Sequence, residues 1–237
     1  MRRSLLTLVM AITLATTSTA HAGIITGFGS SSLPGASTGS LGPIGNTPFP
    51  NNDDAATPNS IAFTIFRNSG GLGPADYEFV VGNSAGITEY LFVGAAINNT
   101  GTPWSHYTFE LGFGTGTNFV RSTTVDLLDF DVPGGTPAPT SGQFTQLWHG
   151  SDLLQWSGAT INPLGVGLPS PFTGSFAFRV DVPDDLALLN PSGLSRFTLR
   201  HTAGTGAVPS VPEPAVMTLL GLSLLAAGGR ASRRRNV

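Results

Sequence analysis

The sequence contains no cysteine and no lysine. The absence of cysteine excludes a disulfide framework, a thiol nucleophile and a sulfur-ligated metal site. A chain of 237 residues is nevertheless long enough to bury a hydrophobic core without covalent cross-links. The absence of lysine means that every permanent positive charge on a side chain is an arginine. The positions of the arginines therefore give the distribution of positive charge along the chain.

Positive charge is scarce in the central part of the chain, residues 23–210. This part holds thirteen acidic residues against five arginines, which gives it a formal charge of −8. The five are Arg67, Arg121, Arg179, Arg196 and Arg200. A basic footprint for nucleic acid is therefore missing, and the negative charge also disfavours docking to anionic lipid.

Helical periodicity is missing from the central part too, whereas short runs of alternating apolar and polar residues are frequent. Such alternation is typical of strands. The predicted strands cover 61–66, 77–81, 87–97, 106–113, 119–130, 144–156 (as one strand or two), 176–182 and 196–201. Turn-forming residues separate them. We therefore predict an all-β fold, an antiparallel β-sandwich of jelly-roll or immunoglobulin-like type, with a closed barrel as the alternative.

The segments between these runs predict connections. Residues 23–60 are rich in Gly, Ser, Pro, Thr and Asn without periodicity, and we expect an arm or loop with at most an edge strand at 23–28. The sequence Asn98-Asn99-Thr100-Gly101 predicts a hairpin turn between two strands. Residues 183–189 have room for one helical turn.

The N-terminus has the pattern of an export signal. Arg2 and Arg3 precede an apolar run from Leu5 to Ala15, and a small, polar segment follows it. This segment ends in Ala20-His21-Ala22, which is an A-x-A cleavage pattern. We expect a signal peptide over 1–22, recognised through Ala20 and Ala22, and a mature chain that begins at Gly23.

The C-terminus combines three features. Val211-Pro212-Glu213-Pro214 precedes an uncharged run of fifteen residues, Ala215 to Gly229. As a helix this run measures about 22 Å, which is shorter than the roughly 30 Å hydrocarbon core of a bilayer. Four arginines follow it: Arg230, Arg233, Arg234 and Arg235. Arginines beside a membrane helix stay on the cytoplasmic side, so we expect a short transmembrane helix with the body of the protein outside.

This order of a proline-acid-proline motif, a hydrophobic helix and a terminal arginine cluster resembles the PEP-CTERM sorting signal of bacterial exported proteins. The resemblance implies processing by a membrane exosortase, with Val211, Pro212, Glu213 and Pro214 as recognition elements. The segment from Glu89 to Gly114 is similar to a hairpin in the choice-of-anchor ectodomains, a family without assigned chemistry. The implied organisation is a signal peptide (1–22), an arm (23–60), a β-sandwich ectodomain (61–210) and a sorting segment (211–237).

The function expected from these features is that of an exported surface or extracellular-matrix protein without catalysis. It would be anchored transiently in the inner membrane, with an exosortase-type enzyme and exopolysaccharide as partners. The alternative is a carbohydrate-binding or glycan-hydrolysing β-sandwich. Three tryptophans are candidates for stacking on sugars, and Trp148 and Trp156 share a face if their strand is unbroken. The candidates are Trp104, Trp148 and Trp156.

Metal and hydrolytic chemistry have weaker candidates. Acidic residues gather near strand ends, where oxygen-rich loops suit Ca²⁺ and where a pair of carboxylates would suit a glycosidase. These acids are Asp53, Asp54, Asp126, Asp129, Asp131, Asp181, Asp184 and Asp185. His106, His149 and His201 fall in separate strand regions without the spacing of a zinc site. We therefore predict no resident metal and no other cofactor, with Ca²⁺ left open.

Overall fold

The computed structural model describes residues 22–33, 38–45, 59–84, 87–123, 126–131, 138–165, 173–184 and 186–206. The chain divides into two compact units, Met1–Thr205 and Gly206–Val237. All the described strands belong to the first unit. The predicted membrane helix at 215–229 belongs to the second and lies outside the described residues. Among the described residues, none of the helices has both the length and the apolar composition needed to cross a membrane.

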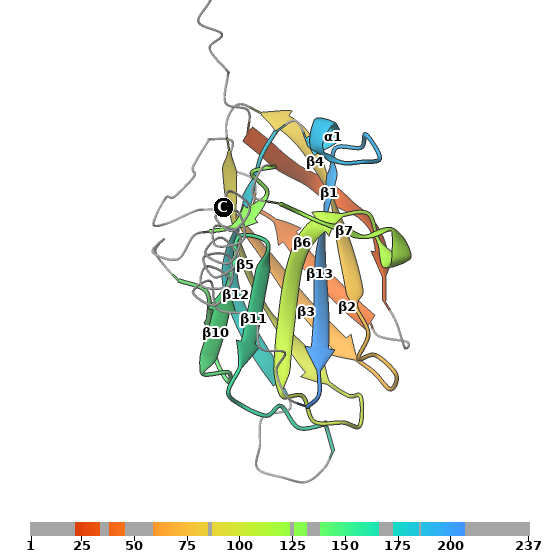
Figure 1. The fold of residues 1–237 in the computed structure, drawn as a ribbon, viewed down its shortest axis with the longest axis vertical. Coiled ribbons are helices and arrows are strands. Elements are labelled where there is room, and N and C mark those ends of the chain that lie inside the picture. Colours follow the sequence, from red (N-terminus) through yellow and green to blue (C-terminus); the bar gives the residue numbers. More distant parts are fainter. Residues whose placement is uncertain are drawn as a thin grey trace, which may run out of the picture. The chain divides into compact units, whose positions relative to one another are not determined.

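Two sheets pack face to face (Figure 1). Sheet A has the strand order β1 (Ala22–Ser32), β4 (Ala75–Ser84), β13 (Arg196–Gly204), β6 (His106–Phe113), β11 (Leu153–Ser157) and β10 (Gln146–His149), and β7 (Val120–Arg121) pairs with β6. Sheet B has the order β2 (Thr38–Ile44), β3 (Ser60–Arg67), β5 (Thr88–Asn98), β12 (Thr173–Val182) and β8 (Asp129–Phe130), and β9 (Thr140–Ser141) pairs with β12. The β3–β5 pair is parallel, whereas the other described pairs are antiparallel.

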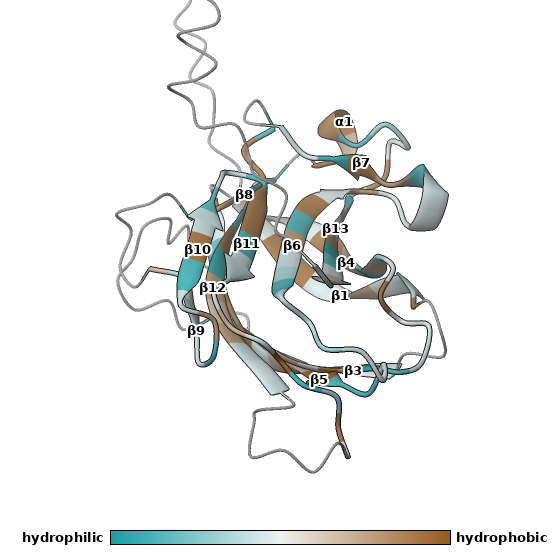
Figure 2. Ribbon diagram, turned by 60° about the horizontal axis from the view of Figure 1, so that its bottom comes forward, coloured by the Kyte–Doolittle hydropathy of each residue, from teal (hydrophilic) through white to brown (hydrophobic). Residues whose placement is uncertain are grey.

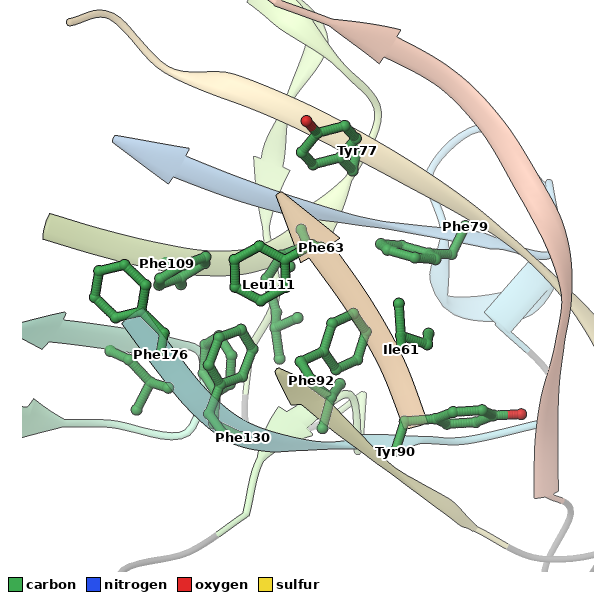
Figure 3. Packing of buried hydrophobic residues seen from close by; sticks show 14 of the residues in the cluster. Ile61, Phe63, Tyr77, Phe79, Tyr90, Phe92, Phe109, Leu111, Phe130 and Phe176 are labelled. Atoms are coloured by element: carbon green, nitrogen blue, oxygen red, sulfur yellow. The ribbon is translucent and has the colours of Figure 1, made fainter. Parts of the chain in front are cut away.

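The alternation in the sequence produces the core of this sandwich. In β3, Ile61, Phe63 and Ile65 are buried between the sheets, while Ala62 and Phe66 are exposed. Apolar and polar bands accordingly alternate along strands such as β6 (Figure 2). Aromatic rings fill most of the interior, and Phe109 lies 4.7 Å from Phe178 across the two sheets, centroid to centroid. Figure 3 shows this cluster of rings. The prediction of an all-β sandwich is confirmed.

The glycine- and serine-rich segment at 23–60 is partly strand, which differs from the expected arm. The edge strand expected at 23–28 exists and extends over Ala22–Ser32, where it pairs with β4. A second edge strand, β2, pairs with β3. Both strands lack clear apolar alternation in the sequence, and backbone pairing with β4 and β3 holds them in their sheets. A Cβ at Gly23 would lie 2.3 Å from the carbonyl oxygen of Pro183, so only glycine fits there.

The predicted hairpin at 98–101 is wrong, because β5 belongs to sheet B and β6 to sheet A. The connection crosses from one sheet to the other instead. The side chain of Asn98 organises this crossing: its amide donates to the carbonyls of Thr102 and Ile161, and its oxygen accepts from the N–H of Thr100. Residues 89–114, which are similar to a hairpin in the choice-of-anchor ectodomains, therefore do not form a hairpin in this structure.

Two further segments differ in part from the prediction. The strand expected at 119–130 is broken into β7 and β8, and Leu127 between them has a positive φ of 58°, which a continuous strand does not allow. Residues 144–156 form the two short strands β10 and β11, one of the two forms expected. The short helices are η1 (Gly116–Asn118) and α1 (Leu186–Leu189). The helical turn expected within 183–189 is confirmed by α1.

Candidate functional site

The last strand before the C-terminal segment lies inside sheet A. β13 pairs with β4 on one side and with β6 on the other. Its end at Gly204 is held by a 2.9 Å hydrogen bond from the N–H of Ser105 to the Gly204 carbonyl. The sorting residues themselves lie outside the described part of the chain. They are Val211, Pro212, Glu213, Pro214, Arg230, Arg233, Arg234 and Arg235.

At the other end, Ala20 of the predicted cleavage pattern also lies outside the described residues. Ala22 is the first residue of β1, where it pairs with Ser84. The predicted mature N-terminus, Gly23, is buried. Cleavage at the predicted bond would therefore leave a mature chain whose first residue already belongs to sheet A.

The tryptophans do not form a common surface. Trp104 and Trp156 are 0% and 1% exposed and belong to the core. Trp148 is 36% exposed and lies opposite Gln155 rather than Trp156, because a turn separates β10 from β11. The unbroken strand that would have placed Trp148 and Trp156 on one face does not form, so the two rings lie on different faces and a sugar cannot stack on all three rings.

The acidic residues are only partly brought together. Asp129 and Asp181 are register partners in the β8–β12 ladder. Asp126 instead closes its own loop, where it accepts hydrogen bonds from the Ser122 hydroxyl at 2.7 Å and from the Thr123 N–H at 2.8 Å. Asp53, Asp54 and Asp185 lie outside the described residues, while Asp131 and Asp184 are buried. Within the described ranges, no group of three or more His, Cys, Asp or Glu side chains is placed to hold a metal ion.

The three histidines lie on three strands and remain apart. His106 on β6 has Nδ1 3.1 Å from the Ser105 hydroxyl. Burial lowers the pKa of His149 on β10, although nearby Asp131 acts in the opposite direction. His201 on β13 is fully buried. No two of them share a strand that would give the spacing of a metal site.

Sequence reasoning missed a buried polar cluster between the sheets, formed by Arg67, Tyr77, Tyr107 and His201. The Tyr107 hydroxyl lies 2.6 Å from Nδ1 of His201, and the rings of Tyr77 and His201 are stacked at 5.6 Å. Burial lowers the pKa of His201 well below its usual value, and the nearby Arg67 guanidinium lowers it further. The alternation of β3 and β13 does place Arg67 and His201 on the inner face, so this signal was present.

A second feature is a pair of hollows on either side of Glu78. The first, of about 200 Å³, lies between the edge strands and is lined by Phe28, Ser31, Gly39, Tyr77 and Glu78 among others. It lies where β1 bulges between Phe28 and Ser31. The bulge wraps the Glu78 carboxylate, because a Cβ at Gly29 would lie 2.3 Å from its Oε2.

The second hollow, of about 450 Å³, is lined by Val120 of β7, by Asn118, Ser192 and Leu194 among others, and again by Glu78. Arg196 donates to Oε2 of Glu78 at 2.8 Å. The backbone N–H and the hydroxyl of Ser30 donate to the same oxygen at 3.1 and 3.2 Å. The carboxylate is therefore held in place between the two hollows.

Comparison with protein families identifies the PEP-CTERM protein-sorting motif at residues 210–235. No curated protein and no solved structure matches the chain. The motif confirms the resemblance noted in the sequence: the chain carries the sorting signal of an exosortase substrate. Such a signal supports export, membrane-associated sorting and an exosortase-type partner. The likeness of the body to choice-of-anchor ectodomains stays a prediction.

Proposed function

We propose that the chain is an exported, non-catalytic β-sandwich protein that an exosortase-type enzyme processes at Pro212-Glu213-Pro214 and that ends at the cell surface or in the extracellular matrix. The observation that carries this proposal is the sorting motif at residues 210–235. The apolar run before the arginines would hold the chain in the membrane for a short time. The sandwich would be the part that is delivered.

The division of roles within the tail follows from the chemistry of its residues. Prolines on both sides of Glu213 keep the preceding backbone extended, which suits recognition by a processing enzyme. A charge at the bilayer centre costs about 2.5 kcal/mol or more on the insertion scale. Arg233, Arg234 and Arg235 would therefore keep the C-terminus on the cytoplasmic side until processing.

The non-catalytic part of the proposal is supported by how the outer face of sheet A uses its carboxylates. Arg200 holds Asp76 through two hydrogen bonds, of 2.7 and 2.9 Å. Arg121 donates to Asp152 at 2.9 Å. Both carboxylates are thus engaged by arginine side chains, whereas a catalytic carboxyl must be able to exchange a proton with a substrate.

The test compares cells with and without the exosortase gene. In cells with the enzyme, replacing Pro212-Glu213-Pro214 by alanines should leave an uncut protein in the membrane fraction, as deletion of the gene should for the unaltered chain. Pro209→Ala, just upstream of the matched residues, serves as the control and should be processed normally. Normal release of the altered chain, or of the unaltered chain without the enzyme, would refute the proposal.

A further inference from the structure

We propose that the two hollows beside Glu78 together bind a chain of neutral sugars. This inference goes beyond the proposed sorting and concerns what the delivered sandwich does. It places the binding surface away from all three tryptophans. One sugar ring would occupy the small hollow at the bulge of β1, and the chain would continue past Glu78 into the larger hollow.

The small hollow has the size and lining for a single ring. Its volume of about 200 Å³ is below the roughly 300–1,000 Å³ of pockets for drug-sized ligands. Phe28, which is 42% exposed, offers an aromatic face to the C–H groups of a sugar. Its ring is fixed by an edge-on contact with Phe79 at 5.8 Å, so a ligand would find the ring already in position.

The hydroxyl of Tyr77 lies at the inner wall of the small hollow and could pair with a sugar hydroxyl. Tyr77 is 5% exposed, and its hydroxyl has no hydrogen-bond partner among the described residues. A Cβ at Gly39 would lie 1.5 Å from this oxygen, so the absence of a side chain in β2 is what leaves room for it. Buried polar groups normally have partners, and a sugar hydroxyl would supply one after a small shift of β2.

Glu78 connects the two hollows. All three donors that hold its carboxylate converge on Oε2. None of the described residues donates to Oε1, which can accept from ligand hydroxyls, and a charge-assisted hydrogen bond of this kind is stronger than a neutral one. The larger hollow adds the exposed apolar side chains of Val120 and Leu194 and the amide of the exposed Asn118.

The charges of the site and of the central part of the chain favour a neutral ligand. Arg196 already neutralises Glu78, so the site does not attract a cation strongly. The central part of the chain carries a formal charge of −8, which repels an acidic polysaccharide. A sugar chain without charge is the hydroxyl-rich ligand that fits both conditions.

The test is titration calorimetry with the full chain in non-ionic detergent. The probes are neutral isomalto-, laminari- and manno-hexaoses and an acidic oligoguluronate of equal length. Phe28→Ala and Leu194→Ala remove one contact from each hollow, and each should weaken binding of a neutral probe about tenfold. Phe66→Ala is the matched control, because Phe66 is 40% exposed on sheet B. It should leave affinity unchanged, and circular dichroism should show all three variants folded.

Four outcomes would overturn the proposal. The first is that no neutral probe binds the unaltered chain, and the second is that oligoguluronate binds more tightly than all of them. The third is that Phe66→Ala weakens binding as much as Phe28→Ala does. The fourth is a loss confined to Phe28→Ala, which would refute the arrangement that spans both hollows. None of these results depends on processing of the tail, so they can be separated from a failure of the sorting proposal.

Discussion

The hydroxyl oxygen of Tyr90 in β5 accepts a 2.9 Å hydrogen bond from the backbone N–H of Ile25 in β1. This contact joins sheet B to the first strand of sheet A, and Figure 3 shows the Tyr90 oxygen directed toward that strand. Burial raises the pKa of Tyr90 to about 12, so the phenol stays neutral at physiological pH. The contact lies only two residues beyond the predicted mature N-terminus and secures the start of the chain.

Tyr90→Phe should therefore destabilise the protein. The change removes one buried hydrogen bond, and we expect the free energy of unfolding to fall by about 1–2 kcal/mol. Tyr77→Phe is the natural comparison, since the Tyr77 hydroxyl has no partner among the described residues. It should not lower stability, because it removes a buried hydroxyl that makes no hydrogen bond to the described residues. Urea denaturation of both variants decides the matter, and equal losses would contradict this account.

The buried histidine predicts a loss of stability in acid. The pKa of His201 in the folded chain lies well below its usual value of 6.5, so the unfolded chain binds the proton first as the pH falls. Stability is thus complete above pH 6.5 and declines below it, by up to about 1.4 kcal/mol per pH unit for this one group. Burial lowers the pKa of His106 and His149 in the same direction.

His201→Asn tests the contribution of this group, because asparagine keeps a polar side chain but cannot take up the proton. Unfolding free energies measured between pH 7.5 and 5 should depend less steeply on pH in the variant than in the unaltered chain. An identical pH dependence in the two chains would show that a group other than His201 causes the loss of stability in acid. A gain in stability on acidification of the unaltered chain would contradict the sign of the effect.

Two ion pairs with different burial should differ in their contribution to stability. Arg179 donates to Glu89 at 2.9 Å, and both side chains are at most 3% exposed. Glu89→Gln would break this buried ion pair, which costs about 3–5 kcal/mol. Arg121→Gln breaks a pair with Asp152 in which Arg121 is 38% exposed, and it should cost less than about 1 kcal/mol. Thermal denaturation with similar losses in both variants would show that burial does not govern these pairs.

The fold could be predicted wherever the side chains alternate. In β3, β6 and β12 most inward positions are aromatic or aliphatic, and the predicted runs match the strands closely. β1 could not be recognised as a long strand because its glycines and serines carry little apolar signal; its place depends on pairing with β4, which is distant in the sequence. The turn chemistry at Asn98 was misleading for a related reason, since a local turn does not determine which sheet receives the next strand.

The candidate site residues, too, could be predicted only where local sequence determines their position. Trp104, Trp148 and Trp156 looked equivalent in the sequence, yet two of them fill the core, because the side of a strand that faces inward depends on where a turn interrupts it. The hollows beside Glu78 combine β1, β4 and the loops around Asn118 and Ser192. Contacts between residues so far apart in the chain cannot be recognised from local sequence patterns. The sorting motif was recognisable because it is contiguous.

Removal of the signal peptide should be visible at the N-terminus of the exported protein. Sequencing should begin at Gly23, directly after the Ala20-His21-Ala22 pattern. Gly23→Val is expected to lower the yield of folded protein, because a Cβ would collide with the Pro183 carbonyl. Thr26→Val, at an exposed position of the same strand, should have little effect. An exported form that retains Met1 would refute the assignment of the signal.

The central claim is that the C-terminal segment directs sorting and is then removed. Intact-mass measurement of the protein released from cells tests it most directly. The released protein should begin at Gly23 and end near Glu213, without the apolar run and the arginines. A released protein that still ends at Val237 would contradict it.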